Sequence, residues 1–232
     1  MGTLFSRRAV LAGLTSGAAL STLPINHAFA ALDDKPFYFL TPDEARFLAA
    51  LCDTLIPEDD FPSASQAGVV DFIDLQLAGP YGKGQFIYMQ PPFPSGTPEQ
   101  GYQVSLIPAT FIRQGIAALM EAETGFVDAD TEARSSVLTR LSEDDFDLGD
   151  LPAKPLFDEL WTLTNQGYFA DPIYGGNEGY AGWEMVGFPG AHAYYLSFVD
   201  KHNVPYPQPP TGINHEPGGD GRIPSGLKPQ EV

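Results

Sequence analysis

The sequence predicts a mainly α-helical protein: a single helical domain with long proline- and glycine-rich coil segments and an extended C-terminal tail. Apolar residues recur at spacings of three and four positions in several segments, and we find no convincing run of alternating strand pattern. Gly (24) and Pro (22) together supply 46 of 232 residues, against a usual share of about 12%. Such a composition predicts long irregular connections between the helices.

The first thirty residues, 1–30, are similar to a twin-arginine (Tat) signal peptide. Arg7 and Arg8 precede a weakly apolar stretch, and Ala28-Phe-Ala30 fits a cleavage site. An ordinary secretory signal or an uncleaved N-terminal anchor are the alternatives. The stretch is shorter than the roughly 20 apolar residues of a spanning helix, so we expect no direct membrane span. Removal of 1–30 leaves 30 acids and 10 bases, a net charge of −20.

The mature chain opens with a strong helix start. Thr41 can cap the first turn, Pro42 suits the first helical position, and Glu44 completes a capping box, so a helix should run from there to Pro57. A second helix is expected over about 67–78. Residues 85–107 are aromatic and rich in proline, so they should be largely non-helical and must pack on something.

Further helices are predicted over about 108–123, 131–141 and 154–168, with a last helix over 190–201 that carries Tyr194, Tyr195, Phe198 and Val199. From His202 the chain becomes rich in proline and then glycine, which is typical of an extended segment without a core of its own. The predicted organisation is therefore a helical domain over 31–203 and a tail over 204–232.

Charge and cysteine content exclude several function classes. The chain has 30 acids against 12 bases, a net charge of −18, which repels nucleic acid and anionic membranes. One cysteine excludes an intramolecular disulfide, a thiolate zinc site, an iron–sulfur cluster and a C-x-x-C-H haem attachment. We find no dinucleotide, Walker or H-E-x-x-H motif either. We therefore expect no catalytic residue, cofactor or metal site in this chain, and a folded-export signal that serves a bound partner.

The titratable residues have ordinary interpretations. His192, His202 and His215 are scattered, without the spacing of a shared metal face. The acidic run over 143–150 lacks the order of an EF-hand, and we interpret it as a solvated helix cap with Ser142.

Two hypotheses about reactive residues stay open. A self-sufficient periplasmic enzyme could use Asp171, Glu184 and His192, with Asn177 nearby in sequence. Cys52 lies on the apolar side of the first helix, which favours a buried, inert thiol. The alternative is an intersubunit disulfide with a partner's cysteine.

The most unusual segment, 168–190, combines six glycines with six aromatic side chains, among them Tyr174, Trp183 and Phe188. Glycine permits close backbone approach, and aromatic rings bring large contact areas. The composition suits a shaped loop that is pressed either against a partner or against the chain's own helices.

The chain resembles the gluconate 2-dehydrogenase subunit 3 family, the small gamma subunits of membrane-bound sugar and sugar-acid dehydrogenases. The resemblance rests on Leu40-Thr-Pro-Asp-Glu-Ala with Leu51-Cys-Asp-Thr-Leu-Ile-Pro57, on Phe72-Ile-Asp-Leu-Gln-Leu-Ala-Gly-Pro-Tyr-Gly82, on Gly101-Tyr-Gln103, and on Asp171-Pro-Ile-Tyr-Gly-Gly-Asn177 through Gly182-Trp183 to Gly187-Phe-Pro-Gly190.

The resemblance implies a non-catalytic subunit of a periplasmic complex at the inner membrane. A large flavoprotein of the glucose-methanol-choline type would carry FAD, and a multihaem cytochrome c would pass electrons to quinone. The small subunit would assist folding, export and stability of the flavoprotein; a free-standing export chaperone is a further alternative. The expected partner-binding residues are Asp171, Tyr174, Gly175, Gly176, Asn177, Trp183 and Phe188.

Overall fold

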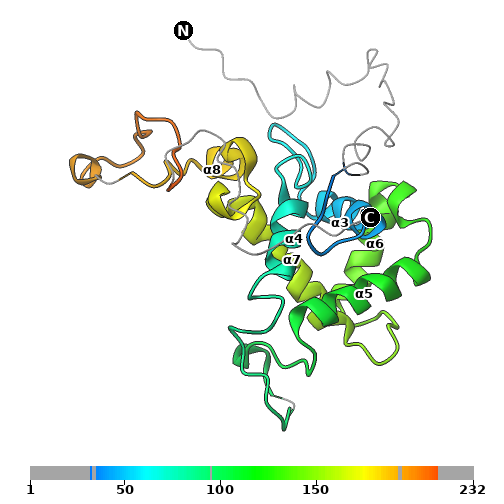
Figure 1. The fold of residues 1–232 in the computed structure, drawn as a ribbon. Coiled ribbons are helices and arrows are strands. Elements are labelled where there is room, and N and C mark those ends of the chain that lie inside the picture. The colour runs from blue at the N-terminus through cyan, green and yellow to red at the C-terminus, as the bar shows by residue number, and fades with distance from the viewer. Residues whose placement is uncertain (1–31, 33–34, 95, 193–194, 214–232) are drawn as a thin grey trace, which may run out of the picture.

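The structure is a computed structural model that describes residues 32, 35–94, 96–192 and 195–213. The signal-peptide residues Arg7, Arg8 and Ala30 lie outside this part of the chain. The described residues form a helical body, as expected (Figure 1). Its main helices are α3 (Pro42–Leu55), α4 (Val69–Ala78), α5 (Pro108–Ala122), α6 (Thr131–Ser142) and α7 (Ala153–Phe169), and a short helix α8 (Ala181–Val186) follows.

Helix α3 begins where the sequence predicts. The Thr41 hydroxyl accepts from the Glu44 backbone N–H, and the Glu44 carboxylate accepts from the Thr41 N–H at 2.8 Å. This reciprocal capping box satisfies two backbone donors that the first turn leaves free. Pro42, which has no N–H to satisfy, occupies the first turn.

Helix α7 is the centre of the body and packs against α3, α4, α5 and α6. Its buried residues Leu156, Leu160 and Leu163 follow the helical repeat and are at most 1% exposed. Burial of each such side chain contributes about 1.5–3 kcal/mol. A core built on one central helix explains why a chain with so many coil residues holds together.

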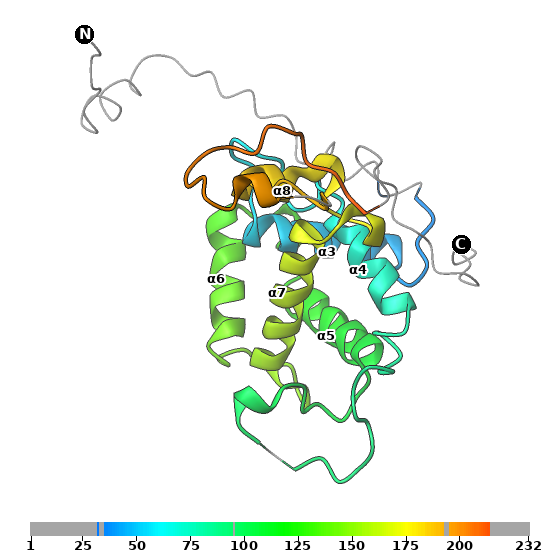
Figure 2. The same cartoon turned by 90° about the vertical axis from the view of Figure 1, so that its left-hand side faces the viewer.

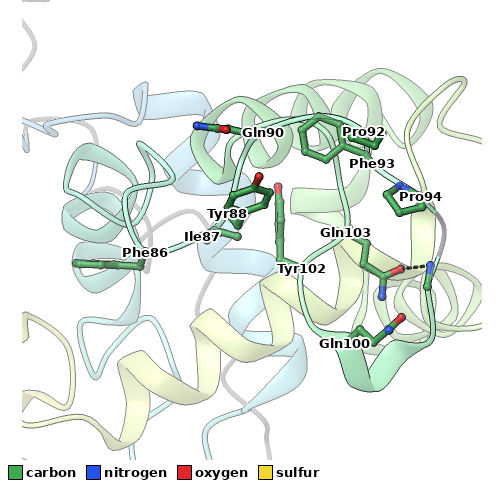
Figure 3. A pocket seen from close by; sticks show the side chains of 11 residues that line it. Phe86, Ile87, Tyr88, Gln90, Pro92, Phe93, Pro94, Gln100, Tyr102 and Gln103 are labelled. Carbon is green, nitrogen blue, oxygen red and sulfur yellow. Dashed lines mark hydrogen bonds between the residues drawn. The ribbon is translucent and has the colours of Figure 1, made fainter.

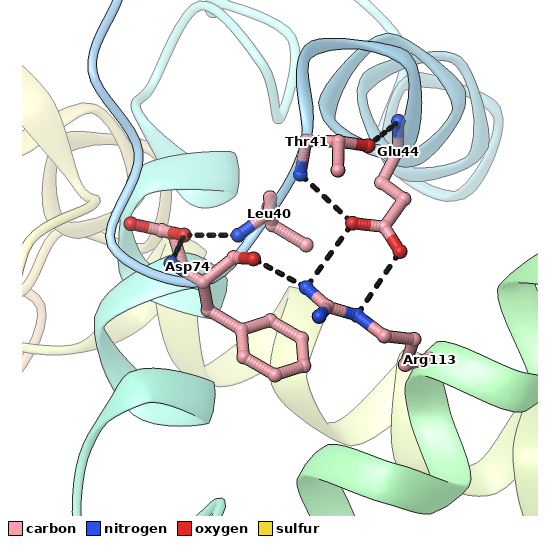
Figure 4. Close-up of polar contacts among 6 residues, drawn as sticks. Leu40, Thr41, Glu44, Asp74 and Arg113 are labelled. Carbon is pink, nitrogen blue, oxygen red and sulfur yellow. Dashed lines mark hydrogen bonds and ion pairs between the residues drawn. The ribbon is translucent and has the colours of Figure 1, made fainter. Parts of the chain in front are cut away.

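A buried carboxylate fixes the segment that enters α3. Asp74 of α4 accepts hydrogen bonds from the backbone N–H groups of Tyr38, Phe39 and Leu40, each at 2.8 Å. Figure 4 shows the bond from Leu40. Asp74 is buried, and burial raises its pKa while the three N–H donors oppose that rise. The carboxylate therefore replaces the secondary-structure partners that this extended segment lacks.

An ion pair clamps the same segment from the other side. The Arg113 guanidinium of α5 donates to the Phe39 carbonyl, and its Nε lies 3.2 Å from the Glu44 carboxylate (Figure 4). The guanidinium also lies over the Phe39 ring, 3.8 Å from its centroid. Helices α3, α4 and α5 are thus joined at the start of the domain.

The predicted last helix over 190–201 is wrong. Within the described residues, this span holds only one 3-10 turn, Leu196–Phe198. Gly190 has a left-handed backbone (φ 88°), and its bridge to Thr211 draws the chain away from a helical path. Tyr195 and Phe198 pack instead on Tyr206 of the returning proline-rich segment, so the aromatic residues stabilise a closed arm.

Two local expectations also need correction. Ser142 is the last residue of α6, so it does not cap a helix that begins at the acidic run. Asp144 has a left-handed backbone (φ 59°), and its carboxylate accepts a hydrogen bond from the Lys154 N–H at the start of α7. Helix α8 lies inside the glycine-rich segment, where the sequence predicts a loop. Short helices of this kind depend on tertiary contacts rather than on their own residue pattern.

The two irregular parts of the body lie at opposite ends of α7. The segment around α8, with the arm over 190–213, lies at the end where α7 stops, and the loop over 84–107 lies near the end where α7 starts (Figure 2). None of the helices in the described part of the chain has the length and apolar character required to cross a membrane.

Candidate partner-binding site

The glycine- and aromatic-rich segment folds back on the end of α7. After α7 ends at Phe169, the chain makes two 3-10 turns, Pro172–Tyr174 and Glu178–Tyr180, and then enters α8. Glu178 N–H donates to the Ala67 carbonyl at 2.9 Å, which ties the segment to the start of α4 as well. The segment is therefore a structured cap rather than a free loop.

Asn177 organises the cap from inside. Its side chain is fully buried; Nδ2 donates to the Ala170 carbonyl at 2.8 Å, and Oδ1 accepts from the Gly182 N–H at 2.9 Å. Its backbone is left-handed (φ 45°), a conformation that asparagine tolerates better than most residues. The side-chain amide of Asn177 thus provides a hydrogen-bond partner for a carbonyl at the end of α7 and for an N–H at the start of α8.

Two glycines let the cap touch α7 directly. A Cβ at Gly176 would lie 2.3 Å from the Gly167 carbonyl oxygen, and a Cβ at Gly182 would lie 2.0 Å from the Tyr168 carbonyl oxygen. Only glycine fits at such distances. The close approach expected for this segment is therefore made to the chain's own helix at these two positions.

Trp183 is part of the chain's interior. It is 5% exposed, and its indole N–H donates to the Phe169 carbonyl at 2.8 Å. Its ring stacks on Tyr180 at 5.3 Å between centroids and meets Phe188 edge-on at 5.0 Å. The indole therefore supports the surface position of Phe188 instead of facing solvent itself.

Asp171 and Tyr180 hold the end of the arm against the cap. The Asp171 carboxylate accepts from the Ile173 N–H at 2.9 Å and from the Ile213 N–H at 2.8 Å, one bond to each oxygen. The Tyr180 hydroxyl accepts from the Gly212 N–H at 2.8 Å. These bonds pin an otherwise extended segment, so the described part of the tail is docked onto the domain.

Three apolar side chains of the cap stay on the surface. Tyr174, at the end of the first 3-10 turn, is 54% exposed, and Val186, at the end of α8, is 60% exposed. Phe188, two residues after α8, is 45% exposed. Exposed aromatic side chains on a rigid support are typical of protein interfaces. We call Tyr174, Val186 and Phe188 the cap surface.

The seven predicted partner-binding residues therefore divide by position. Tyr174 and Phe188 are exposed, and the others lie inside or at the edge of the cap and determine its shape: Asp171, Gly175, Gly176, Asn177 and Trp183. Val186 carries no signal in the sequence, because an isolated valine forms no pattern.

The residues of the enzyme hypothesis form no catalytic cluster in the described part of the chain. Both Asp171 oxygens are used by backbone N–H groups, and the His192 ring Nε2 lies 3.2 Å from the Pro209 carbonyl. Glu184 is exposed on α8. Among the described residues, no three His, Cys, Asp or Glu side chains lie together in a group that could hold a metal ion.

Cys52 lies far from the surface. It is fully buried in α3, and its sulfur is 3.3 Å from the Thr164 hydroxyl of α7. Burial raises the pKa of the thiol to about 12. The interpretation as a buried thiol is confirmed, whereas an intersubunit disulfide would require α3 to separate from α7 and stays a prediction.

Comparison with known proteins gives one match. The family described as gluconate 2-dehydrogenase subunit 3 matches residues 42–190, which is more than half of the chain and runs from the start of α3 to the end of the cap. No curated protein and no solved structure matches the chain.

Proposed function

Because the chain belongs to the gluconate 2-dehydrogenase subunit 3 family, we propose that it is the non-catalytic small (gamma) subunit of a periplasmic FAD-dependent dehydrogenase complex. In this role it assists the folding, twin-arginine export and stability of a large flavoprotein subunit of the glucose-methanol-choline type. FAD belongs to that partner, and haem c to a multihaem cytochrome partner at the inner membrane.

The family match over residues 42–190 carries the proposal. The sequence of the leader supports the export role, since a twin-arginine pair precedes a chain in which we identify no cofactor motif. The twin-arginine route exports folded proteins, so this leader can carry a folded partner across the membrane together with this chain.

The cap surface is the part of the molecule that we assign to contact with the flavoprotein. Tyr174 and Phe188 would enter the interface directly, whereas Asn177 and Trp183 keep the cap rigid so that little entropy is lost on binding. Aromatic residues on such supports supply a large share of binding energy in many interfaces.

The proposal is tested by producing the flavoprotein with and without this chain. We expect the amount of membrane-bound, flavin-containing large subunit and the acceptor-dependent oxidation of gluconate to fall together when the chain is absent. An unchanged amount of loaded flavoprotein without the chain would refute the proposal. A flavoprotein that needs the chain for export but is later isolated without it would instead favour the free-standing chaperone.

A further inference from the structure

The loop over residues 84–107, here called the aromatic loop, lies at the other end of the body from the cap surface (Figure 2). Its base is fixed: the Ala109 N–H donates to the Gly82 carbonyl at 3.0 Å, and the Tyr81 hydroxyl donates to the Glu159 carboxylate of α7. The loop therefore leaves the helical body from a defined position.

Two large aromatic side chains of this loop are almost fully exposed. Phe86 is 77% exposed and Tyr88 is 79% exposed, the highest values among the large apolar residues described. A third, Phe93, is 39% exposed. The sequence predicts that this stretch packs on something, and in the isolated chain these rings pack on little.

Side-chain amides maintain the shape of the loop. Gln103 Oε1 accepts from the Gly96 N–H at 2.7 Å (Figure 3). Gln100 Oε1 accepts from the Thr97 N–H at 2.8 Å, and the Tyr102 hydroxyl donates to the Leu106 carbonyl. The loop curves around an open cavity of about 500 Å³. A loop held in this way loses less conformational entropy on binding than a free one.

Charge distinguishes the loop from the rest of the molecule. Of its 24 residues, Glu99 alone is charged, whereas charged residues make up 18% of the chain, which has a net charge of −18. The side chains that line the cavity are uncharged, mainly aromatic residues, prolines and glutamines. Depletion of charge together with enrichment in aromatic residues is the composition of an interface core.

We propose that the aromatic loop is a second docking surface for the large flavoprotein subunit, with Phe86 and Tyr88 inserted into an uncharged apolar cleft of that partner. The inference rests on the proposed function and adds a contact at the opposite end of α7 from the cap surface. Helix α7 has 17 residues and is therefore about 25 Å long, and the two contacts lie toward its opposite ends (Figure 2).

Two contacts on one partner suit a subunit that stabilises another folded chain. Once the cap surface is bound, the aromatic loop binds at a high effective concentration, so the joint affinity exceeds that of either contact. A partner reaching this loop needs no basic groups to offset the negative charge of the chain, so this contact should persist at high salt.

Other occupants fit the loop less well. A second copy would bring another chain of net charge −18 close to the first. An anionic lipid surface attracts Lys and Arg, and no basic residue occurs between Gly84 and Ile107. A protein cleft without charge is the complement that the composition favours.

The experiment compares two double variants of the full chain, each produced with the flavoprotein and the cytochrome. Phe86→Ser with Tyr88→Ser removes the exposed rings. Gln114→Ser with Gln208→Ser changes two exposed glutamines that lie outside the aromatic loop and the cap surface. Complexes are isolated on a tag on this chain and the Kd for the flavoprotein is measured at low and high salt. Thermal unfolding of each variant alone shows whether the fold is kept.

We expect the aromatic variant to unfold like the wild type and to bind the flavoprotein roughly thirtyfold or more weakly at both salt concentrations, since truncated interface hot spots have effects of this size. The glutamine variant should bind normally. If the wild-type chain binds flavoprotein and the aromatic variant binds it equally well, the inference is wrong while the proposed function stands. Loss of the cytochrome alone, loss of self-association, or loss of binding to neutral phosphatidylcholine vesicles would each assign the loop to another occupant and overturn the proposal.

Discussion

Replacement of Asp74 by Ala is expected to lower the free energy of unfolding by about 2 kcal/mol. The change leaves three backbone N–H groups, those of Tyr38, Phe39 and Leu40, without the carboxylate that they share. An average loss of about 1 kcal/mol for each donor gives about 3 kcal/mol. Burial raises the pKa of Asp74, so removal of the carboxylate also relieves part of its desolvation cost, and the net loss is smaller than the sum for the three donors.

For a mature chain of this size, about 2 kcal/mol corresponds to a fall in Tm of about 4–8 °C, measured by circular dichroism on the mature chain. Asp71→Ala is the matched control, one turn earlier on α4, since Asp71 pairs with Lys35 where both side chains are partly exposed. Such pairs contribute about 0–1 kcal/mol. Equal Tm values for the two variants, or an Asp74→Ala variant as stable as the wild type, would refute the role assigned to the buried carboxylate.

Three further predictions concern the cap, the thiol and the leader. Trp183→Ala should lower the free energy of unfolding by about 3–5 kcal/mol. Trp183→Phe should lower it by about 1 kcal/mol, because phenylalanine keeps most of the packing and loses the bond to the Phe169 carbonyl. Calorimetry that finds both variants as stable as the wild type would contradict the buried position of the indole. Burial raises the pKa of Cys52 to about 12, so the thiol should not react with maleimide in the folded chain near pH 8. It should react fully in guanidinium, where its pKa is the ordinary value of about 8.5. Rapid labelling of the folded protein, or a mass that shows a disulfide to a partner, would argue against the buried thiol. Arg7→Lys with Arg8→Lys should leave this chain and the flavoprotein in the cytoplasm, and fractionation that still finds the flavoprotein in the periplasm would exclude export of the flavoprotein by this leader.

The long helices could be predicted from the sequence because their signals are local. The capping box at Thr41 and Glu44 and the apolar repeat of α7 act within one or two turns, and both appear in the structure as expected. Starts and ends of α5 and α6 agree with the predicted spans to within one residue.

The wrong prediction of a helix over 190–201 has its cause in contacts with a segment that lies further along the chain. The aromatic residues around Tyr195 suggest a helix, but Tyr206 and the bridge between Gly190 and Thr211 draw them into an arm. The spacing of apolar residues within 190–201 cannot predict these contacts, because they depend on residues outside that segment.

Composition predicts where the candidate site lies but not the roles of its residues. Glycine and aromatic content single out the segment, and the structure separates Asn177 and Trp183, which face inward, from Tyr174 and Phe188, which are exposed. Asp74 belongs to a segment on which the family resemblance rests, but the sequence does not indicate its role, because a buried carboxylate on a helix looks like any surface acid.

The proposed role is tested most directly by isolating the tagged chain from membranes in mild detergent and following protein and flavin absorbance through gel filtration. We predict that the chain elutes with a larger flavin-containing subunit, and that the flavin stays with that subunit after the two are separated. Elution of the chain alone, or flavin that remains bound to the isolated chain, would contradict its assignment as the non-catalytic small subunit.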